Sequence, residues 1–220
     1  MVPTRTVEQY VKTLYQLERL SQRSLVQMKT LAEAMEVTPG SATAMVKHLD
    51  EAGLIHYYPR KGTSLTDEGR RLALSMIRRH RLLETFLVRI LSYDWSEVHL
   101  EAEELEHAVS EGFIERVDTL LGSPTVDPHG DPIPSPDGSV SASEYVPLSE
   151  APHGGKFEVA RIISEDRNFL TLMKERRIVP GAQFVLSDKN EIAGTITVKN
   201  VDTGEEFAFG YDLGQKILVK

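Results

Sequence analysis

A proline- and glycine-rich tract near the middle of the chain constrains the fold more than any other feature. It runs from residue 122 to residue 138 and reads GSPTVDPHGDPIPSPDG, and sequence of low hydrophobicity continues to about Pro152. Proline has no amide hydrogen to donate and disfavours the helical conformation in the residue before it, so the tract sustains neither a helix nor a central strand. We interpret residues 123–152 as a linker, with helical patterns before it and short strand-like patterns after it.

The composition indicates a folded, globular protein without thiol chemistry. The chain has 220 residues, of which 40% are hydrophobic, enough for one large domain or several small ones. It contains no cysteine, so disulfides and thiolate ligands are excluded, and any metal is expected to be held by oxygen and nitrogen. We see neither a signal-like apolar segment at the start nor a run of about 18 apolar residues, and we expect a cytoplasmic protein that does not enter the membrane.

The net charge of −8 is unevenly distributed along the chain. Residues 1–71 carry 10 Lys and Arg against 8 Asp and Glu, a balance of +2. Residues 72–121 carry 5 against 10, and residues 122–220 carry 10 against 15. The first region is the only one without an acidic excess, which makes it the candidate region for contact with nucleic acid.

Helical periodicity in the first region predicts a helix-turn-helix. Apolar residues recur at helical spacing in residues 6–18, and a second helix at 28–35 is stopped by the turn 36–40. A third helix starts near Ser41 and ends at Gly53, a good C-terminal cap.

The next residues predict a wing and two long helices. Residues 54–58 and 63–66 are strand-like, and the turn between them carries basic residues at its tip. Thr66 is expected to cap a long helix that runs to about Leu91. After a break at 94–96, a further long helix is expected to end near Gly122.

The predicted DNA interface lies at the start of the second helix of the helix-turn-helix and at the wing tip. Small residues there allow close approach to the DNA backbone, and basic side chains can reach phosphates. The residues are Thr38, Pro39, Gly40, Ser41, Thr43, Ala44, Lys47, Arg60 and Lys61. The alternative is a winged helix used for protein contacts, but a basic wing tip favours DNA.

Residues 98–110, which read VHLEAEELEHAVS, combine glutamates and histidines on a predicted helix. At about 100° per residue, four donor residues fall within one arc of about 100°, beside the apolar stripe of the helix. These are His99, Glu103, Glu106 and His107. Taken alone, the stretch favours a solvated acidic face. The preceding helix adds His80 and Glu84 at i, i+4 spacing, which shifts the interpretation to a metal site.

The search for catalytic motifs gives no candidate. His-Glu-x-x-His, Gly-x-Ser-x-Gly and phosphate-binding glycine loops are absent, and only residues 104–107 form a helical Glu-x-x-His where a di-iron bundle needs two. We expect a protein that is not an enzyme, with a di-metal protein that does not bind DNA as the alternative. His129 and His153 are interpreted as loop residues.

The region after the tract predicts a small β domain. Residues 156–163, 183–186, 194–199 and 216–220 are strand-like, with a short helical piece at about 170–176. Several short strands with glycine turns suggest a small barrel, so the predicted fold class is mainly α with a C-terminal β domain.

Together, these motifs resemble the diphtheria-toxin-repressor and manganese-transport-regulator family. The resemblance covers nearly the whole chain and rests on LTDEG at 65–69, RHRLLE at 79–84, the His and Glu residues of 98–107, and HGDPIP at 129–134. It implies homodimeric repressors that bind palindromic operator DNA when loaded with Mn²⁺ or Fe²⁺.

The resemblance also implies a division into domains. A winged helix-turn-helix is expected over residues 1–71 and a helical metal-binding and dimerisation domain over 72–122. The linker then takes 123–152, and an SH3-like domain, similar to the small ferrous-transport accessory fold, takes 153–220.

Two metal sites are implied by the same resemblance. The primary site matches Glu103, Glu106, His107 and Gln9, the last standing where the family uses Met or Asp. The ancillary site matches His80, Glu84, His99, Glu165 and Asn168, the last two coming from the SH3-like domain. Glu103 stands where iron-type members have Cys. Oxygen-rich ligation without sulfur favours a harder ion, so Mn²⁺ is expected first and Fe²⁺ second, although Zn²⁺ would bind tightly to almost any such site.

Overall fold

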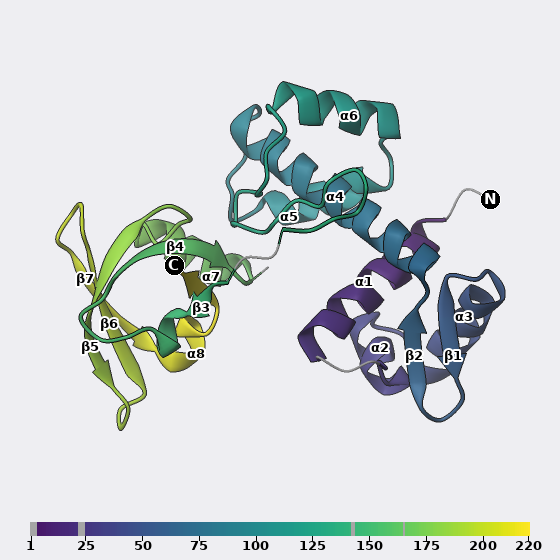
Figure 1. Cartoon of the computed structure of the whole chain (residues 1–220), viewed down its shortest axis with the longest axis horizontal. Coiled ribbons are helices and arrows are strands. Elements are labelled where there is room, and N and C mark those ends of the chain that lie inside the picture. Colours follow the sequence, from purple (N-terminus) through teal and green to yellow (C-terminus); the bar gives the residue numbers. More distant parts are fainter. Residues whose placement is uncertain (1–3, 22–24, 142–143, 165) are drawn as a thin grey trace. The chain divides into compact units, whose positions relative to one another are not determined.

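The computed structural model describes residues 4–21, 25–141, 144–164 and 166–220, and the chain forms two compact units (Figure 1). One unit comprises residues 1–79 with 134–139, and the other comprises residues 80–133 with 140–220. The long helix α4 (Asp67–Arg89) begins in the first unit and ends in the second. No helix among the described residues is both long enough and apolar enough to cross a membrane.

The first unit is a winged helix-turn-helix, as predicted. Its elements in chain order are α1 (Arg5–Ser21), α2 (Met28–Ala34), α3 (Pro39–Glu51), β1 (Ile55–Tyr58) and β2 (Gly62–Leu65). The two strands pair antiparallel from Ile55 with Leu65 to Tyr58 with Gly62, which makes the predicted wing.

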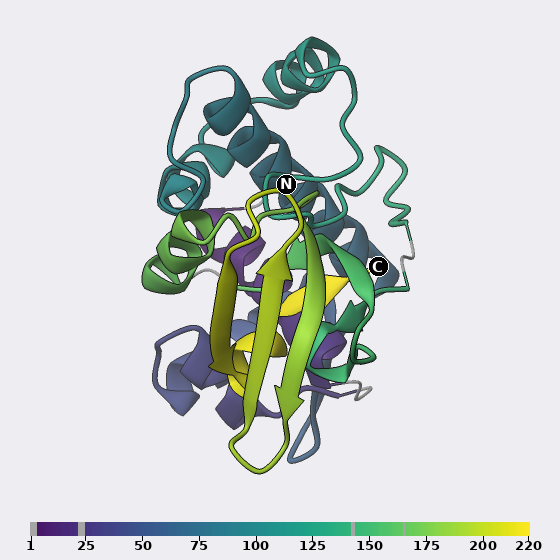
Figure 2. The same cartoon turned by 90° about the vertical axis from the view of Figure 1, so that its left-hand side faces the viewer.

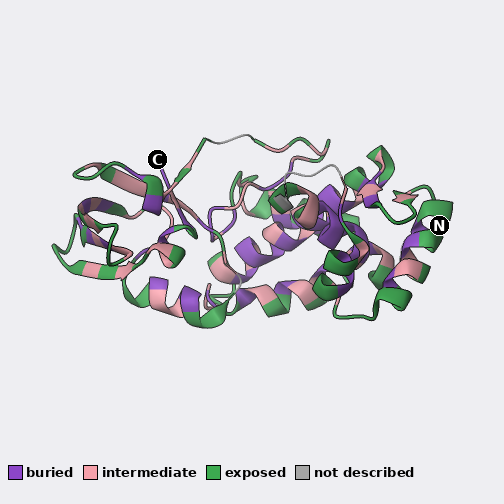
Figure 3. Cartoon of the chain, turned by 90° about the horizontal axis from the view of Figure 1, so that it is seen from below, coloured by how far each residue is buried: buried purple, intermediate pink, exposed green. Residues whose placement is uncertain are grey.

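The core of the first unit is built from one face of each helix. On α1, Tyr10, Val11 and Leu14 are buried at the predicted helical spacing, and α3 buries Val46 and Leu49. Figure 3 shows this as buried stripes on helices whose other faces are exposed. Burying these apolar faces against one another is the main stabilising contribution to so small a helical module.

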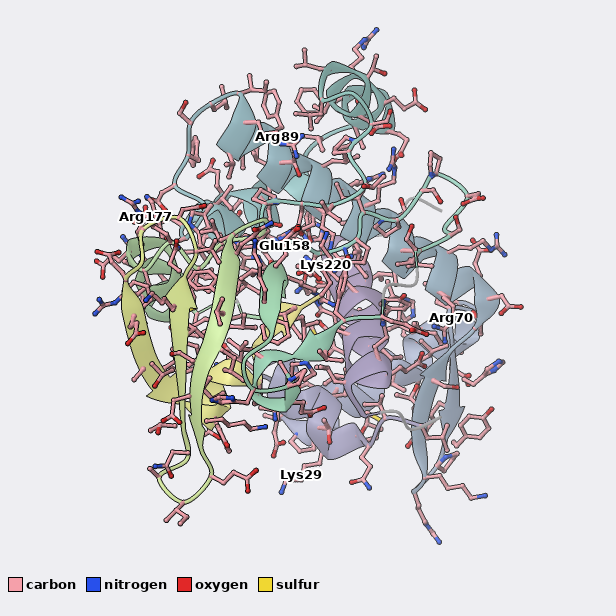
Figure 4. The ribbon with its side chains drawn as sticks, turned by 60° about the vertical axis from the view of Figure 1, so that its left-hand side comes forward. Lys29, Arg70, Arg89, Glu158, Arg177 and Lys220 are labelled. Carbon is pink, nitrogen blue, oxygen red and sulfur yellow. The ribbon has the colours of Figure 1, made fainter. Side chains whose placement is uncertain are left out.

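Two polar devices fix the start of α4. Thr66 is its N-cap, as predicted, because Thr66 Oγ1 accepts a hydrogen bond from the Gly69 amide at 3.1 Å. Glu18 of α1 accepts from the Leu65 amide at 2.8 Å and from Arg70 Nη2 at 2.7 Å; Figure 4 labels Arg70. The end of α1 is thereby fastened both to the wing and to α4.

The helical part of the second unit differs from the prediction in one respect. The expected long helix from Val98 to near Gly122 is wrong: it is two helices, α5 (Val98–Glu106) and α6 (Glu111–Leu120). Ser110 causes the break, since it adopts an extended conformation and its side chain caps α6 by accepting from the Phe113 amide. The break ends the expected apolar stripe, and Phe113 is 40% exposed.

The first part of the expected linker is a folded loop. Residues 125–133 are closed by a bridge between Val126 and Pro132 and by the hydrogen bond from the Ile133 amide to the Thr125 carbonyl. Asp127 and His129 are buried within it. Proline excludes helix and sheet here, as expected, but it does not exclude a compact loop held by side chains. The end of the expected linker is also structured, in β3 (Val146–Pro147) and the 3₁₀ turn Leu148–Glu150.

The C-terminal part of the second unit is a six-stranded antiparallel sheet in the order β3-β8-β4-β5-β6-β7. The remaining elements are β4 (Lys156–Ile162), α7 (Arg167–Glu175), β5 (Gln183–Asn190), β6 (Thr195–Asn200), β7 (Glu206–Gly210), α8 (Tyr211–Gly214) and β8 (Ile217–Val219). Figure 2 shows the long strands of this sheet side by side, in green to yellow. The four predicted strands and the helical piece are confirmed, whereas β3 and β7 are additional.

The sheet curls around a continuous apolar core. Strands β4, β5, β6 and β8 and helix α7 all contribute fully buried residues, among them Ile162, Leu170, Leu186 and Ile217. The pairing of β4 with β8 is closed at its end by Lys220 and Glu158, whose side chains approach to 3.0 Å (Figure 4). The predicted SH3-like domain, and with it the fold class, is confirmed.

Candidate metal centre and nucleic-acid interface

The candidate metal ligands lie on α4 and α5 of the second unit. His80 and Glu84 are one turn apart on α4, and His99 and Glu103 are one turn apart on α5, so each pair shares one face of its helix. Glu106 is the last residue of α5 and is completely buried, while His80 and Glu84 are also buried. Buried carboxylates require compensating partners, and these donors supply them to one another.

Three donor atoms form a close triangle at the centre of this cluster. His80 Nε2 lies 3.1 Å from Glu84 Oε1 and 3.0 Å from His99 Nδ1, and His99 Nδ1 lies 3.3 Å from the same Glu84 oxygen. The other ring nitrogen of His80, Nδ1, lies 2.6 Å from Glu106 Oε2. A carboxylate accepts, so His80 Nδ1 carries the proton, and in the neutral ring Nε2 presents a lone pair to the triangle. Lone pairs this close together need a shared proton or a metal ion between them.

The predicted ligands on α4 and α5, together with His107, form one continuous cluster. His99 Nε2 lies 3.5 Å from Glu103 Oε2, and single donor atoms of His80, His99 and Glu103 lie within 4.8 Å of one another. Glu106 contacts His80 through one oxygen and lies 3.4 Å from His107 Nε2 through the other. The contact between His80 and Glu106 therefore joins a residue expected in the ancillary site to one expected in the primary site.

The electrostatics of Glu84 match a ligand that is ionised when it binds a cation. Burial alone raises the pKa of the Glu84 carboxyl. When the imidazoles are protonated, the charge and hydrogen bond of His80, the hydrogen bond of His99 and the charge of His129 outweigh burial and hold this pKa well below its usual value. Glu84 thus has two sets of partners, one for each carboxylate oxygen.

A second cluster lies on the other side of Glu84 and was missed from the sequence. Single donor atoms of Glu84, Asp127 and His129 lie within 4.8 Å of one another, and all three residues are buried. His129 Nδ1 lies 3.8 Å from Glu84 Oε2. His129 Nε2 lies 2.8 Å from the carbonyl oxygen of Trp95, to which it donates its proton, so Nδ1 is left with a lone pair that faces the carboxylate.

Asp127 carries the marks of a strained buried carboxylate. Burial and the nearby charges of Asp131 and Glu84 raise its pKa well above the usual value, although Arg81 opposes them. Arg81 approaches Asp127 to 3.6 Å and donates to Asp131 at 2.8 Å. Two carboxyl groups and an imidazole whose donor atoms lie within 4.8 Å of one another would be stabilised by a divalent cation.

The sequence did contain a signal for the second cluster. His129 lies in a loop, as interpreted, but in a loop with a buried interior. The spacing Asp127-Pro-His129 places two potential ligands two residues apart, directly before the glycine of the HGDPIP motif. What the spacing could not give is the contact of this loop with Glu84, because it depends on how residues 125–133 fold back onto α4.

The remaining predicted ligands belong to other elements of the chain. Gln9 is half-buried on α1 in the first unit. Asn168 is exposed in the first turn of α7. Glu165 lies outside the residues that the structure describes, so its predicted role as a ligand stays a prediction.

The predicted DNA-contacting residues are presented at the surface of the first unit. Helix α3 starts at Pro39, two residues earlier than expected, because Thr38 is its N-cap and accepts from the Ser41 amide at 3.2 Å. Thr38, Gly40, Ser41 and Ala44 are exposed, as are Pro39 and Lys47. The amide groups of the first turn of a helix point outward along its axis, where a phosphate can accept from them.

The wing presents the two basic residues. Arg60 and Lys61 are exposed in the turn between β1 and β2, and Arg60 has φ +65. Gly62 follows with φ +136, and a side chain there would place its Cβ 2.4 Å from the Val26 carbonyl oxygen. This crowding holds the base of the wing against the segment before α2, so that the tip projects from a fixed base.

The helical part of the second unit leaves large apolar side chains in water. They lie at the end of α4, on α5 and on α6, and are Ile90, Leu91, Tyr93, Leu100, Phe113 and Leu120. Leu100 is 74% exposed and Leu120 is 62% exposed. Such a concentration of exposed apolar residues favours burial against a partner.

Comparison with protein families matches almost the entire chain. Residues 3–63 match the iron dependent repressor N-terminal DNA binding domain, residues 66–135 match the iron dependent repressor metal binding and dimerisation domain, and residues 146–220 match the FeoA domain. The middle match includes residues 125–133, in accord with the folded loop.

The similar proteins are metal-dependent repressors. The iron-dependent repressor IdeR of Mycobacterium tuberculosis (strain ATCC 25618 / H37Rv) is 30% identical over 218 residues, covering 92% of this chain and 94% of the relative. The HTH-type transcriptional regulator MntR of Lysinibacillus sphaericus is 32% identical over 120 residues, covering 54% of this chain and 84% of the relative.

Two solved structures are similar over nearly their full length. A manganese-dependent transcriptional repressor in complex with manganese has 39% sequence identity and a TM-score of 0.86, with 97% of this chain and 98% of that chain covered. ScaR with bound Zn²⁺ has 32% identity and a TM-score of 0.80, with 99% of both chains covered.

Proposed function

The chain belongs to the iron-dependent repressor family, and from this premise we propose that it is a metal-dependent transcriptional repressor that binds DNA as a homodimer. The observation that carries the proposal is the convergence of His80, Glu84, His99 and Glu106 in a chain that also has a winged helix-turn-helix. Membership of this family also confirms the expectation that the protein is a regulator and not an enzyme.

The donor set fits a divalent ion of intermediate hardness, and we propose Mn²⁺. The candidate ligands are carboxylates and imidazoles, with the amides of Gln9 and Asn168, and the chain has no cysteine to supply sulfur. Fe²⁺ is the second candidate, since relatives include both iron-dependent repressors and manganese regulators. Zn²⁺ would bind in vitro with little regard to the physiological ion.

The residues that would hold the ion fall into three groups. Glu103, Glu106 and His107 form the proposed primary site, with Gln9 as its fourth candidate. His80, Glu84 and His99 form the proposed ancillary site, with Glu165 and Asn168 as further candidates. Asp127 and His129 extend the cluster beyond Glu84. A bound dication would neutralise the converging carboxylates and lone pairs and so tie α4 to α5.

The proposed DNA contact uses the first turn of α3 and the wing. Thr38, Ser41 and Thr43 offer hydroxyl groups near the helix start, where backbone amides also point outward, and Lys47 is exposed on the same helix. Arg60 and Lys61 would reach phosphates beside the groove. No Arg, Asn or Gln stands in the first turn of α3, so base discrimination would rely on apolar contacts and DNA shape.

A homodimer with twofold symmetry would bind an operator with the same symmetry, which is a palindrome. Two copies related by a twofold axis would present two winged helices to two half-sites, and their spacing depends on the helices that form the interface. The exposed apolar residues just after α4 and those on α5 and α6 supply surface for that interface. Metal binding and operator binding are then linked, since each favours the same arrangement of the dimer. We place the activity in the cytoplasm, where the operator DNA is.

The test is a titration of a palindromic promoter fragment, followed by fluorescence anisotropy, with Mn²⁺, with Fe²⁺ under anaerobic conditions, with Zn²⁺ and with chelator. We expect tight binding with Mn²⁺ and weak binding with chelator. Alanine at Lys47, Arg60 and Lys61 should weaken binding to every sequence and reduce the salt slope by about 0.9 per lost phosphate contact. Lys199→Ala is the control, because Lys199 is exposed on β6 of the SH3-like domain, outside the winged helix-turn-helix, and lies 4.0 Å from Glu206. DNA binding that is equal with Mn²⁺ and with chelator would refute metal control, and an unchanged salt slope would remove the three basic residues from the interface.

A further inference from the structure

We infer that Trp95 positions the metal ligand His129 from outside the donor set, and that Arg167, Thr171 and Lys174 of helix α7 hold Trp95 in place for this. The inference rests on the proposed function, in which Asp127 and His129 extend the metal cluster. It gives the SH3-like domain an indirect role in metal binding, through the segment 94–97 that precedes α5.

The His129 ring is oriented by a hydrogen bond to the main chain of Trp95. A neutral imidazole has a single N–H, and His129 uses it from Nε2 to donate to the Trp95 carbonyl oxygen at 2.8 Å. This hydrogen bond selects the tautomer in which Nδ1 keeps a lone pair, and Nδ1 is the nitrogen that faces Glu84. Hydrogen bonds of this kind fix both the tautomer and the ring plane of metal-binding histidines.

Trp95 is itself held in place by packing of its ring. Its indole ring lies beside the His129 ring, with 5.0 Å between centroids, and packs against the apolar core of the SH3-like domain. Among the described residues, the buried indole nitrogen Nε1 has no hydrogen-bond partner. The ring is therefore placed by packing against that core, and its main-chain carbonyl is placed with it.

The segment 94–97 is attached to α7 by side-chain contacts. Asp94 pairs with Lys174, Glu97 pairs with Arg167, and Thr171 Oγ1 lies 3.4 Å from Ser96 Oγ. Asp94 also accepts from the Ser96 amide at 3.0 Å and from its hydroxyl at 2.7 Å, which makes the segment a compact turn. Three successive turns of α7 thus hold the residues on either side of Trp95.

The main chain of His129 is held by the same domain. Its carbonyl oxygen accepts from the Ile162 amide of β4 at 2.8 Å, and Asp131 pairs with Arg161 of β4. Gly130 lies against β4 so closely that a Cβ would come within 2.1 Å of the Ala160 carbonyl oxygen. With its backbone fixed by β4 and its ring fixed by Trp95, His129 has little freedom left, and the lone pair of Nδ1 stays directed at Glu84.

A positioning role has a measurable size. Loss of the outer partner of a metal-binding histidine typically weakens metal affinity by about 10–100-fold. The change should be confined to the metal that uses His129, since His80 and His99 are held by Glu84 and Glu106 and not by Trp95.

The experiment compares full-length variants by Mn²⁺ binding, with free Mn²⁺ measured by electron paramagnetic resonance. His129→Ala identifies the Mn²⁺ that depends on this ligand. Trp95→Ala removes the ring, and the double variant Lys174→Ala/Arg167→Ala frees the segment 94–97 from α7. Both pairs in the double variant are exposed, and such pairs contribute little to folding, so the fold is retained. Arg177→Ala is the matched control, because Arg177 is exposed at the outer surface beyond the end of α7 (Figure 4).

We expect both variants to bind the His129-dependent Mn²⁺ about 10-fold more weakly than the wild type and to leave any other Mn²⁺ unchanged. The charge-retaining variant Lys174→Arg/Arg167→Lys should restore the affinity, and Arg177→Ala should not change it. Trp95 is the single tryptophan, so its quenching by Mn²⁺ should shift to about 10-fold higher concentration in the double variant. Wild-type Mn²⁺ affinity in Trp95→Ala or in the double variant would overturn the inference. A wild-type protein that binds no Mn²⁺ at all would instead overturn the proposed function, and the inference with it.

Discussion

Replacing Glu106 with glutamine removes one charge from the centre of the metal cluster and leaves the side-chain volume nearly unchanged. Glu106 is completely buried, and its Oε2 accepts from His80 Nδ1 at 2.6 Å. A hydrogen bond to a charged group contributes about 1.5–3 kcal/mol and a neutral one about 0.5–1.5 kcal/mol. The smaller desolvation cost of the amide offsets part of that difference. We therefore expect the metal-free variant to be less stable than the wild type by about 1 kcal/mol or less.

The larger effect should appear when metal is added. At a Mn²⁺ concentration of about 100 times Kd, binding stabilises the wild type by about 2.7 kcal/mol. If the weaker amide ligand raises Kd about 100-fold, the same Mn²⁺ concentration stabilises the variant by only about 0.4 kcal/mol. The substitution is thus expected to remove about 2 kcal/mol of metal-dependent stability, more than it removes from the metal-free protein.

Urea unfolding with and without Mn²⁺ measures both quantities. Trp95 lies in the same compact unit as Glu106, so its fluorescence follows the unfolding of that unit. Glu101→Gln is the control, since Glu101 is exposed on the same helix and should leave the response to Mn²⁺ unchanged. If Glu106→Gln gains as much stability from Mn²⁺ as the wild type does, Glu106 is not a metal ligand. Metal-stimulated operator binding should be lost in the same variant.

Two further predictions concern the loop and the turn that surround His129. Gly130→Ala should be destabilising by several kcal/mol, because the new Cβ would meet the Ala160 carbonyl oxygen at 2.1 Å and φ is +85. The control Gly122→Ala, at φ +74 with open space around it, should cost only about 1–2 kcal/mol. Equal urea midpoints for the two variants would refute the crowding argument. The side-chain hydrogen bond from Lys174, with those from Ser96, lowers the pKa of Asp94 to about 2. The lowered pKa of Asp94 stabilises the folded state when the pH is above the unfolded pKa of about 4, and this stabilisation is lost as the pH falls towards 2. In acid titrations of the urea midpoint, Asp94→Asn should therefore lose less stability across this pH range than the wild type.

The helices and strands that the sequence predicted correctly are those whose pattern is local. The spacing of Tyr10, Val11 and Leu14 and the cap at Thr66 indicate α1 and the start of α4 from local sequence, although Glu18 also holds the start of α4 in the fold. The break between α5 and α6 was missed although Ser110 and Gly112 are weak helix formers, because such residues also occur inside helices and packing decides whether Ser110 caps a new helix. Strand β7 was missed although Phe207 and Phe209 alternate with exposed residues, because an alternation of five residues is too short to distinguish an edge strand from a loop without its pairing to β6.

In the candidate site, too, the sequence predicted the contacts that depend on local spacing and missed those that depend on packing. Helical spacing placed His80 with Glu84 and His99 with Glu103, because i, i+4 positions share a face whatever the tertiary structure. It could not reveal that Glu106 contacts His80, nor that the proline-rich loop returns to Glu84, since both depend on the packing of segments far apart in the sequence. In the sequence, the prolines and glycines of residues 122–138 indicate a linker. In this loop they instead permit the tight turn that buries Asp127 and His129.

Glu84 determines how variants of this centre have to be interpreted. Its Oε1 lies at 3.1 Å from His80 and 3.3 Å from His99, and its Oε2 lies at 3.8 Å from His129, so one carboxylate serves both clusters. A substitution of Glu84 therefore changes both clusters at once and cannot assign a lost metal to either. Substitutions of His99 and His129 do separate them, because each histidine contacts only its own side of the carboxylate. If His99 and His129 hold separate ions, the losses of binding free energy in His99→Ala and His129→Ala will add in the double variant; losses that do not add would show that the shared carboxylate couples the two ions.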